Sequence, residues 1–130
     1  MVKTKILWTL VLAMAIASAP AFAGEAVQMW KCEMEDTTTE AQVIRGAEAW
    51  LAAAKTMKGG QNIQAYVYFP VAVNMTGNSD VMFVISTPTF TEWGQFWDGY
   101  NGSQAAKVDK ANEAFVVCPD SAVWELVKVK

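Results

Sequence analysis

The chain has 130 residues, of which 53% are hydrophobic and 18% are charged, and its formal net charge is −3 at pH 7. Because the sequence has neither a basic excess nor a run of Lys or Arg, it excludes binding to nucleic acid or to an anionic membrane surface through a basic patch. The sequence also contains no histidine. That absence excludes Ser-His and Cys-His nucleophiles, histidine-ligated haem and His-rich metal centres.

Residues 1–23 have the pattern of a cleaved signal peptide. Two lysines precede an apolar run at 6–17, and Ala21 and Ala23 supply the small residues that signal peptidase reads. The alternative is an uncleaved anchor, but the apolar run of about 12 residues is short of the roughly 20 that span a bilayer. We therefore expect a periplasmic or secreted protein with no membrane attachment after cleavage, whose residues 24–130 form a single domain.

Removal of that segment makes the chain more acidic. Without Lys3 and Lys5, 8 basic side chains stand against 13 acidic ones, which gives the mature chain a net charge of −5. This balance again predicts no nucleic-acid partner.

The two cysteines, Cys32 and Cys118, stand near opposite ends of the mature chain. A small exported domain commonly joins such a pair in a disulfide, and the alternative is a pair of unlinked buried thiols. A metal site built on these residues is disfavoured, because two cysteines without CxxC spacing and without histidine supply too few soft ligands.

The first half of the mature chain predicts a strand followed by a helix. Residues 26–34 alternate so that Trp30 and Cys32 face the core. Apolar residues then recur from Val43 to Met57 at helical spacing, and Gly59 with Gly60 ends that helix. Two capping pairs compete for its start: Thr37 with Glu40, and Thr39 with Gln42.

The second half predicts two strands, a helical region and a last strand. Residues 62–74 alternate as a long strand, which Pro70 makes an edge strand or a bulged one. A turn at 75–80 connects it to a strand at 81–87. A helix starting at Thr87 and Pro88 is interrupted at 101–103 and continues as a further helical segment, and a strand at 121–129 closes the chain.

This order of elements predicts an α+β fold of the ferredoxin-like βαββαβ kind, with a four-stranded antiparallel sheet and two helices on one face. The first and last strands are neighbours in that topology, which brings Cys32 close to Cys118. The pattern resembles the dimeric α/β-barrel superfamily, which includes cofactor-free monooxygenases, haem-degrading proteins, chlorite dismutases and proteins of no known activity. The resemblance implies two sheets that pack face to face and enclose pockets, but the fold alone selects no activity.

The densest aromatic stretch is TEWGQFWDGY at 91–100. On a helix, Phe90, Trp93, Trp97 and Tyr100 project from one face. Packing of these rings in the core is the plain explanation of the stretch. The alternative is that some of them, Trp97 and Tyr100 above all, form the wall of a ligand pocket.

The sheet face away from the helices is also rich in apolar groups. Strand parity assigns to it Met29, Lys31, Glu33, Gln64, Tyr66, Tyr68, Met82, Val84, Ser86, Val123, Glu125 and Val127. We expect this face to be a homodimer interface, with Tyr66, Tyr68, Lys31 and Glu125 around any enclosed cavity. The alternative is a solvated face.

No motif assigns a reaction, so we predict no catalytic residue, no cofactor and no metal. Two function classes remain. The first is an exported, non-enzymatic domain that serves as an interaction module or binds a small apolar or aromatic ligand. The second is a cofactor-independent, oxygenase-like enzyme. For either, the candidate ligand-binding residues are Trp93, Trp97, Tyr66 and Tyr68. An enzyme needs a closed pocket with a polar group at the reacting atom, whereas an interaction module needs only a complementary face.

Overall fold

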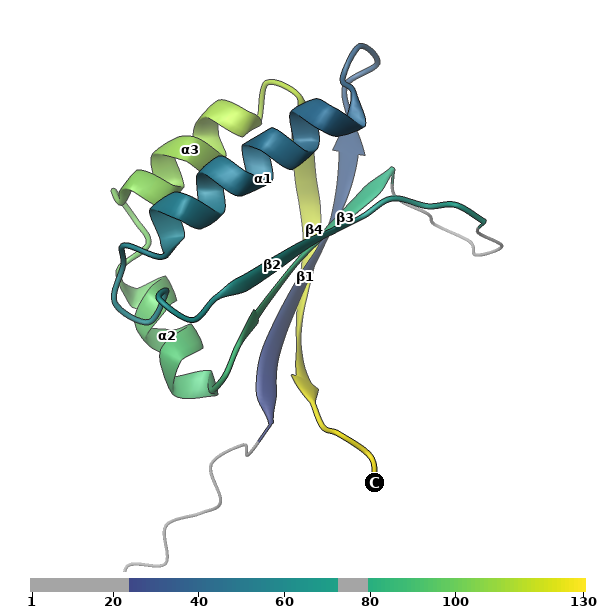
Figure 1. Cartoon of the computed structure of the whole chain (residues 1–130). Coiled ribbons are helices and arrows are strands. Elements are labelled where there is room, and N and C mark those ends of the chain that lie inside the picture. The colour runs from purple at the N-terminus through teal and green to yellow at the C-terminus, as the bar shows by residue number, and fades with distance from the viewer. Residues whose placement is uncertain (1–23, 73–79) are drawn as a thin grey trace, which may run out of the picture.

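The computed structural model describes residues 24–72 and 80–130, so the predicted signal peptide and most of the predicted turn lie outside the described residues. The described part forms a sheet of four strands with its helices on one side (Figure 1). In chain order the elements are β1 (Glu25–Met34), α1 (Glu40–Ala54), β2 (Gln64–Tyr68), β3 (Val81–Thr87), α2 (Phe90–Asp98), α3 (Gln104–Asn112) and β4 (Val116–Leu126).

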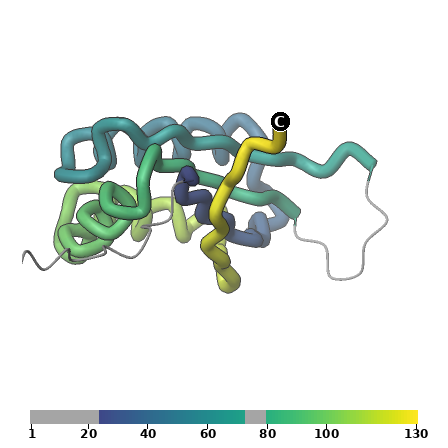
Figure 2. Tube along the Cα trace, turned by 90° about the horizontal axis from the view of Figure 1, so that it is seen from below, coloured from purple at the N-terminus to yellow at the C-terminus, as the bar shows by residue number. Residues whose placement is uncertain are grey.

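The sheet has the strand order β2-β3-β1-β4, and every neighbouring pair is antiparallel. This order and the sequence of elements confirm the predicted ferredoxin-like α+β fold. β2 lies at an edge of the sheet, as Pro70 indicated. The view from below in Figure 2 shows the helices gathered on one side of the strands.

Helix α1 begins at the second of the two predicted caps. The Thr39 hydroxyl accepts a hydrogen bond from the backbone N–H of Gln42, and the Gln42 side chain accepts one in return from the backbone N–H of Thr39 at 2.8 Å. After the helix, Gly59 has a φ of +80°, and a Cβ there would lie 2.4 Å from the carbonyl oxygen of Glu92. A glycine is required at this position by the backbone conformation and by the close approach of α2.

In the second half of the chain, several helices and strands begin or end at residues other than those predicted. α2 and α3 are separate helices, each with its own cap, because the hydroxyls of Thr89 and Ser103 accept backbone hydrogen bonds at 3.1 Å. The predicted interruption of the second helical region at 101–103 is therefore confirmed, and the region consists of two helices. The last strand was predicted at 121–129 but starts earlier, at Val116, because its first residues pair with the end of β1. β2 is shorter than predicted.

The hydrophobic core is centred on Phe96, whose side chain is 0% exposed. Its ring packs against Trp50 at a centroid distance of 5.8 Å and against Trp97 at 5.0 Å. The predicted aromatic stripe from Phe90 to Tyr100 did not include this residue, and its own members are only half-buried. α2 therefore packs through two adjacent faces: Phe96 contacts α1, and the stripe residues Trp93 and Trp97 contact β1.

A β-bulge in β4 changes which side chains face the helices. Lys31 pairs with Asp120 and Glu33 with Val117, so β4 has one residue more than β1 between these pairs. The assignment of Val123 and Glu125 to the open sheet face was wrong, because both pair with β1 residues on the helix side. The same shift places Trp124 on the open face, where it is 59% exposed. Pro119 lies within the bulge, and a proline inside a strand is the one feature of the sequence that indicated an irregularity there.

The predicted disulfide is present between Cys32 and Cys118, with an S–S distance of 2.01 Å and a sequence separation of 86 residues. It joins β1 to β4 at the bulge. Because these strands are also hydrogen-bonded neighbours, the covalent bond and the sheet pairing hold the two ends of the domain together.

We expect the double variant Cys32→Ala/Cys118→Ala to lose about 4–5 kcal/mol of unfolding free energy in urea denaturation, because the bond no longer restricts the unfolded chain. Dithiothreitol should destabilise the wild-type protein by a similar amount and leave the variant unchanged. Equal stability of the variant and the oxidised wild type would contradict this role of the bond.

Candidate functional site

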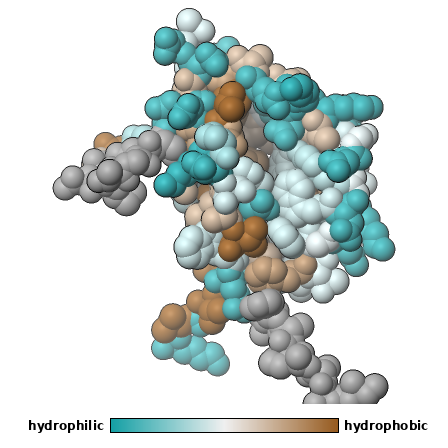
Figure 3. Space-filling view, turned by 180° about the vertical axis from the view of Figure 1, so that it is seen from behind, coloured by the Kyte–Doolittle hydropathy of each residue, from teal (hydrophilic) through white to brown (hydrophobic). Residues whose placement is uncertain are grey.

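A cavity of about 310 Å³ lies between α1, α3 and the helix-facing side of the sheet. Its walls come from β1, α1, β2, β3, α2, α3 and the start of β4, and the Cys32–Cys118 disulfide is part of the lining. Figure 3 views the molecule from behind, the side on which α3 and β4 lie, and shows a recess in the surface between them. The volume is at the lower end of the range typical of small-molecule sites.

The space exists because α3 packs along α1 instead of lying flat on the sheet. The Asn112 side chain donates a hydrogen bond to the Gly46 carbonyl of α1 at 3.1 Å. A Cβ on Gly46 would lie 2.8 Å from the Asn112 side-chain oxygen, so this glycine permits the close contact of the two helices. The sheet beneath α3 is therefore left partly uncovered.

Six of the 18 lining residues are aromatic. They are Trp30, Trp50, Phe83, Trp97, Tyr100 and Phe115. The rings of Trp97 and Tyr100 have centroids 4.5 Å apart, and those of Trp30 and Trp97 are 6.0 Å apart. Contacts of this kind between rings are favourable and hold the wall in one arrangement.

A chain of three hydrogen-bonded side chains crosses one end of the cavity. The Trp50 indole N–H donates to the Tyr100 hydroxyl at 2.9 Å, and that hydroxyl donates to Oδ2 of Asp109 at 3.0 Å. Burial raises the pKa of Tyr100 well above its ordinary range; the Trp50 hydrogen bond lowers it by less, and the Asp109 charge raises it further. Tyr100 therefore stays protonated and serves as a fixed donor.

The indole nitrogen Nε1 of Trp97 is buried and has no hydrogen-bond partner within the described part of the chain. Buried N–H groups are nearly always paired, because an unpaired one costs about 1–3 kcal/mol. Trp97 also lines the cavity. Because the nitrogen itself is not accessible to water, other atoms of the indole form this part of the cavity surface.

The charged residues of the lining are both acidic. Asp109 and Glu113 come from α3 and its end, and among the lining residues within 24–72 and 80–130 there is no Lys or Arg. Glu113 forms an ion pair with Lys110 at 2.6 Å, and Asp109 forms none within those ranges. Over the same residues, no group of three or more His, Cys, Asp or Glu is placed to hold a metal ion.

The four predicted ligand-binding residues do not come together. Trp97 lines the cavity, whereas the indole N–H of Trp93 donates to Oε1 of Gln28 at 2.9 Å and Trp93 is not part of the lining. Tyr66 and Tyr68 lie on the opposite face of the sheet, 44% and 49% exposed. Sequence reasoning missed Trp50 and Asp109 as parts of the site. Trp50 lay on the apolar face of the first helix, but nothing in the sequence indicated that α3 would carry Asp109 to Tyr100.

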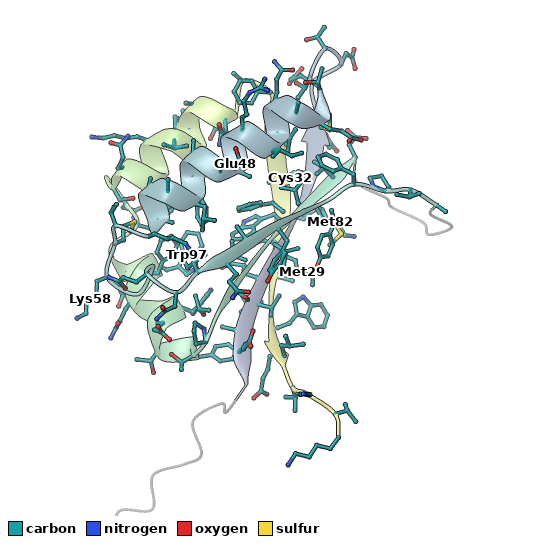
Figure 4. The ribbon with its side chains drawn as sticks, viewed as in Figure 1. Met29, Cys32, Glu48, Lys58, Met82 and Trp97 are labelled. Carbon is teal, nitrogen blue, oxygen red and sulfur yellow. A yellow bond between two sulfur atoms is a disulfide. The ribbon has the colours of Figure 1, made fainter. Side chains whose placement is uncertain are left out.

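The open face of the sheet is apolar at its centre. Figure 4 shows Met29 and Met82 on this side and Trp97 on the other. Val84 is 2% exposed although no helix covers it, because it lies between Met29 and Tyr66 on the neighbouring strands. Trp124 adds a large exposed ring from β4. Lys31 is on this face as predicted, but Glu125 is not.

A protein from Arabidopsis thaliana shares the fold, with 6% sequence identity over 82% of this chain and 96% of that chain and a TM-score of 0.54. A dimeric ferredoxin-like protein of unknown function from Thermobifida fusca is 14% identical over 85% of this chain and 97% of its own, with a TM-score of 0.48. A mutant chlorite dismutase from Candidatus Nitrospira defluvii is 16% identical, and the match covers 83% of this chain and 42% of that chain with a TM-score of 0.41.

The likeness to the Arabidopsis thaliana protein shows the fold and no activity. No protein-family model matches the chain, and no curated protein matches it. Within residues 24–72 and 80–130, no helix has the length and apolar character needed to cross a membrane.

We expect Tyr100→Phe to lower the unfolding free energy at pH 7 by about 1–3 kcal/mol, because the buried Trp50 N–H loses its acceptor. In the unfolded chain this phenol ionises near its ordinary pKa of about 10, whereas in the folded chain its pKa is raised. The wild type should therefore lose stability as the pH rises above about 10, and the variant should lose less.

Urea denaturation at neutral and alkaline pH measures both effects. Tyr66→Phe is the matched control, because its hydroxyl donates to the nearby Gln64 side chain on an exposed surface. Equal losses in the two variants would show that the Trp50–Tyr100–Asp109 chain contributes nothing particular to stability.

Proposed function

We propose that the protein is an exported, non-enzymatic domain that binds a small, largely apolar molecule. The observation that carries the proposal is the 310 Å³ aromatic-lined cavity with the hydrogen-bonded Tyr100 and Asp109 side chains at one end. A cavity with apolar walls and a few fixed polar groups is the usual form of a small-molecule site. The predicted signal peptide and the Cys32–Cys118 disulfide support export.

Binding is favoured over the oxygenase-like alternative by the chemistry of the polar groups. A general base works best when its pKa lies near the operating pH. Tyr100 is held in its protonated form, and the Asp109 carboxylate is already engaged as its acceptor. These groups fix the wall and orient a ligand, whereas none of them is arranged to take a proton from one.

We expect Ala47→Leu to abolish binding while the protein remains folded, because Ala47 lines the cavity and a larger side chain would fill it. Ala49→Leu is the matched control, since it makes the same change on the same helix at an exposed position. Two measurements apply: native mass spectrometry of protein purified from its own cells, and tryptophan fluorescence titration with 2-acetylnaphthalene, a neutral aromatic ketone.

The proposal fails if wild-type protein carries no bound molecule and if Ala47→Leu and Ala49→Leu respond alike to the ketone. Thermal unfolding of both variants shows whether a loss of binding reflects a loss of the fold.

We infer further that the open sheet face forms a homodimer. An apolar surface that includes Met29, Met82 and the exposed ring of Trp124 is unfavourable in water, and a second copy of the same face would cover it. The cavity lies on the other side of the sheet, so the dimer leaves its mouth free.

Light scattering should give twice the monomer mass for the wild type at micromolar concentration and the monomer mass for Trp124→Glu, because a charge would be buried at the interface. Ile44→Glu is the control, since Ile44 is a similarly exposed apolar residue on α1. A monomeric wild type, or a dimer that survives Trp124→Glu, would contradict this interface.

A further inference from the structure

The charge of the cavity wall constrains what the cavity can hold. Its ionisable carboxylates are Asp109 and Glu113, and no cationic side chain is among the described lining residues. Lys110 forms an ion pair with Glu113, whereas within residues 24–72 and 80–130 the Asp109 carboxylate has no ion-pair partner and accepts a hydrogen bond from the Tyr100 hydroxyl. An anionic ligand would meet repulsion from this carboxylate, and a cationic one would meet attraction.

The rings beside that carboxylate have the properties of a cation site. Tyr100 donates to Asp109, and the Trp97 ring lies 4.5 Å from the Tyr100 ring between centroids. Indole and phenol rings attract a cation through the negative charge of their faces, and the attraction grows when the cation leaves water. Carboxylate and aromatic faces therefore meet at one end of the same cavity.

We propose, on the basis of the binding function inferred above, that the natural ligand is an organic cation of the alkyl- or aryl-ammonium class. Its charged nitrogen lies near the Asp109 carboxylate against the rings of Tyr100 and Trp97. Its apolar part extends into the cavity toward Trp30 and the disulfide. The mature chain, with 8 basic and 13 acidic side chains, attracts a cation at long range as well.

The test uses two probes of the same shape. Benzyltrimethylammonium and neopentylbenzene differ only in a quaternary nitrogen in place of a quaternary carbon, and benzoate supplies an anion of comparable ring size. Tryptophan fluorescence titration should show at least 10-fold tighter binding of the ammonium compound than of neopentylbenzene, and the weakest binding for benzoate. Raising the salt concentration should weaken binding of the ammonium compound alone.

Variants of Asp109 assign the effect to this residue. Asp109→Asn keeps an acceptor for Tyr100 but removes the charge, so the preference for the ammonium compound should fall about 10-fold with neopentylbenzene unaffected. Asp109→Glu should keep the preference. Glu48→Gln is the control, because Glu48 is an exposed carboxylate of α1 outside the cavity lining (Figure 4).

The possible outcomes separate this inference from the binding function itself. Equal affinity for the two isosteres, or a preference that survives Asp109→Asn, would overturn the cation assignment while leaving the cavity as a binding site. Failure of both probes to bind, together with no effect of Ala47→Leu on the neutral ketone, would overturn the proposed function as well.

Discussion

The pairing of β1 with β4 is the constraint on which the rest of the structure depends. It joins the two ends of the domain through backbone hydrogen bonds and the Cys32–Cys118 bond. The same corner is held by Phe115, whose carbonyl oxygen accepts from the Glu35 N–H at 3.0 Å and from the Thr38 hydroxyl at 3.0 Å. Because the chain that leaves α3 is fixed there, α3 can rest on α1 without lying on the sheet. The cavity is the space that this leaves.

The aromatic residues of α2 and the turn after it have two different roles. Phe96 is fully buried and joins α2 to α1 and the sheet, so its ring contributes chiefly to stability. Trp97 and Tyr100 follow it in sequence but face the cavity. One short aromatic segment therefore supplies both the core and the wall of the site, and the two interpretations of that segment hold for different residues.

Sequence reasoning predicted what depends on local pattern. The fold class, the disulfide, the start of α1 at Thr39 and the open-face positions of β1, β2 and β3 followed from periodicity, capping and topology. What it missed depends on contacts distant in sequence. A single extra residue in β4 reversed the faces of Val123 and Glu125, and strand parity carries no information about such an insertion. The cavity was also beyond prediction, since it follows from how one helix rests on another.

The β4 bulge has consequences for both faces of the sheet. By parity from Cys118, a regular β4 would turn the Trp124 indole toward the helices and leave Val123 and Glu125 on the open face. The extra residue instead places Trp124 beside Val27 on the open side, where the sheet has no helix to cover it. Compared with a regular strand, the bulged β4 therefore places a large apolar ring on the surface that we propose as the dimer interface and not in the layer next to the helices. The bulge therefore separates the two roles that we propose for this sheet: ligand binding on the helix side and contact with a second copy of the chain on the other.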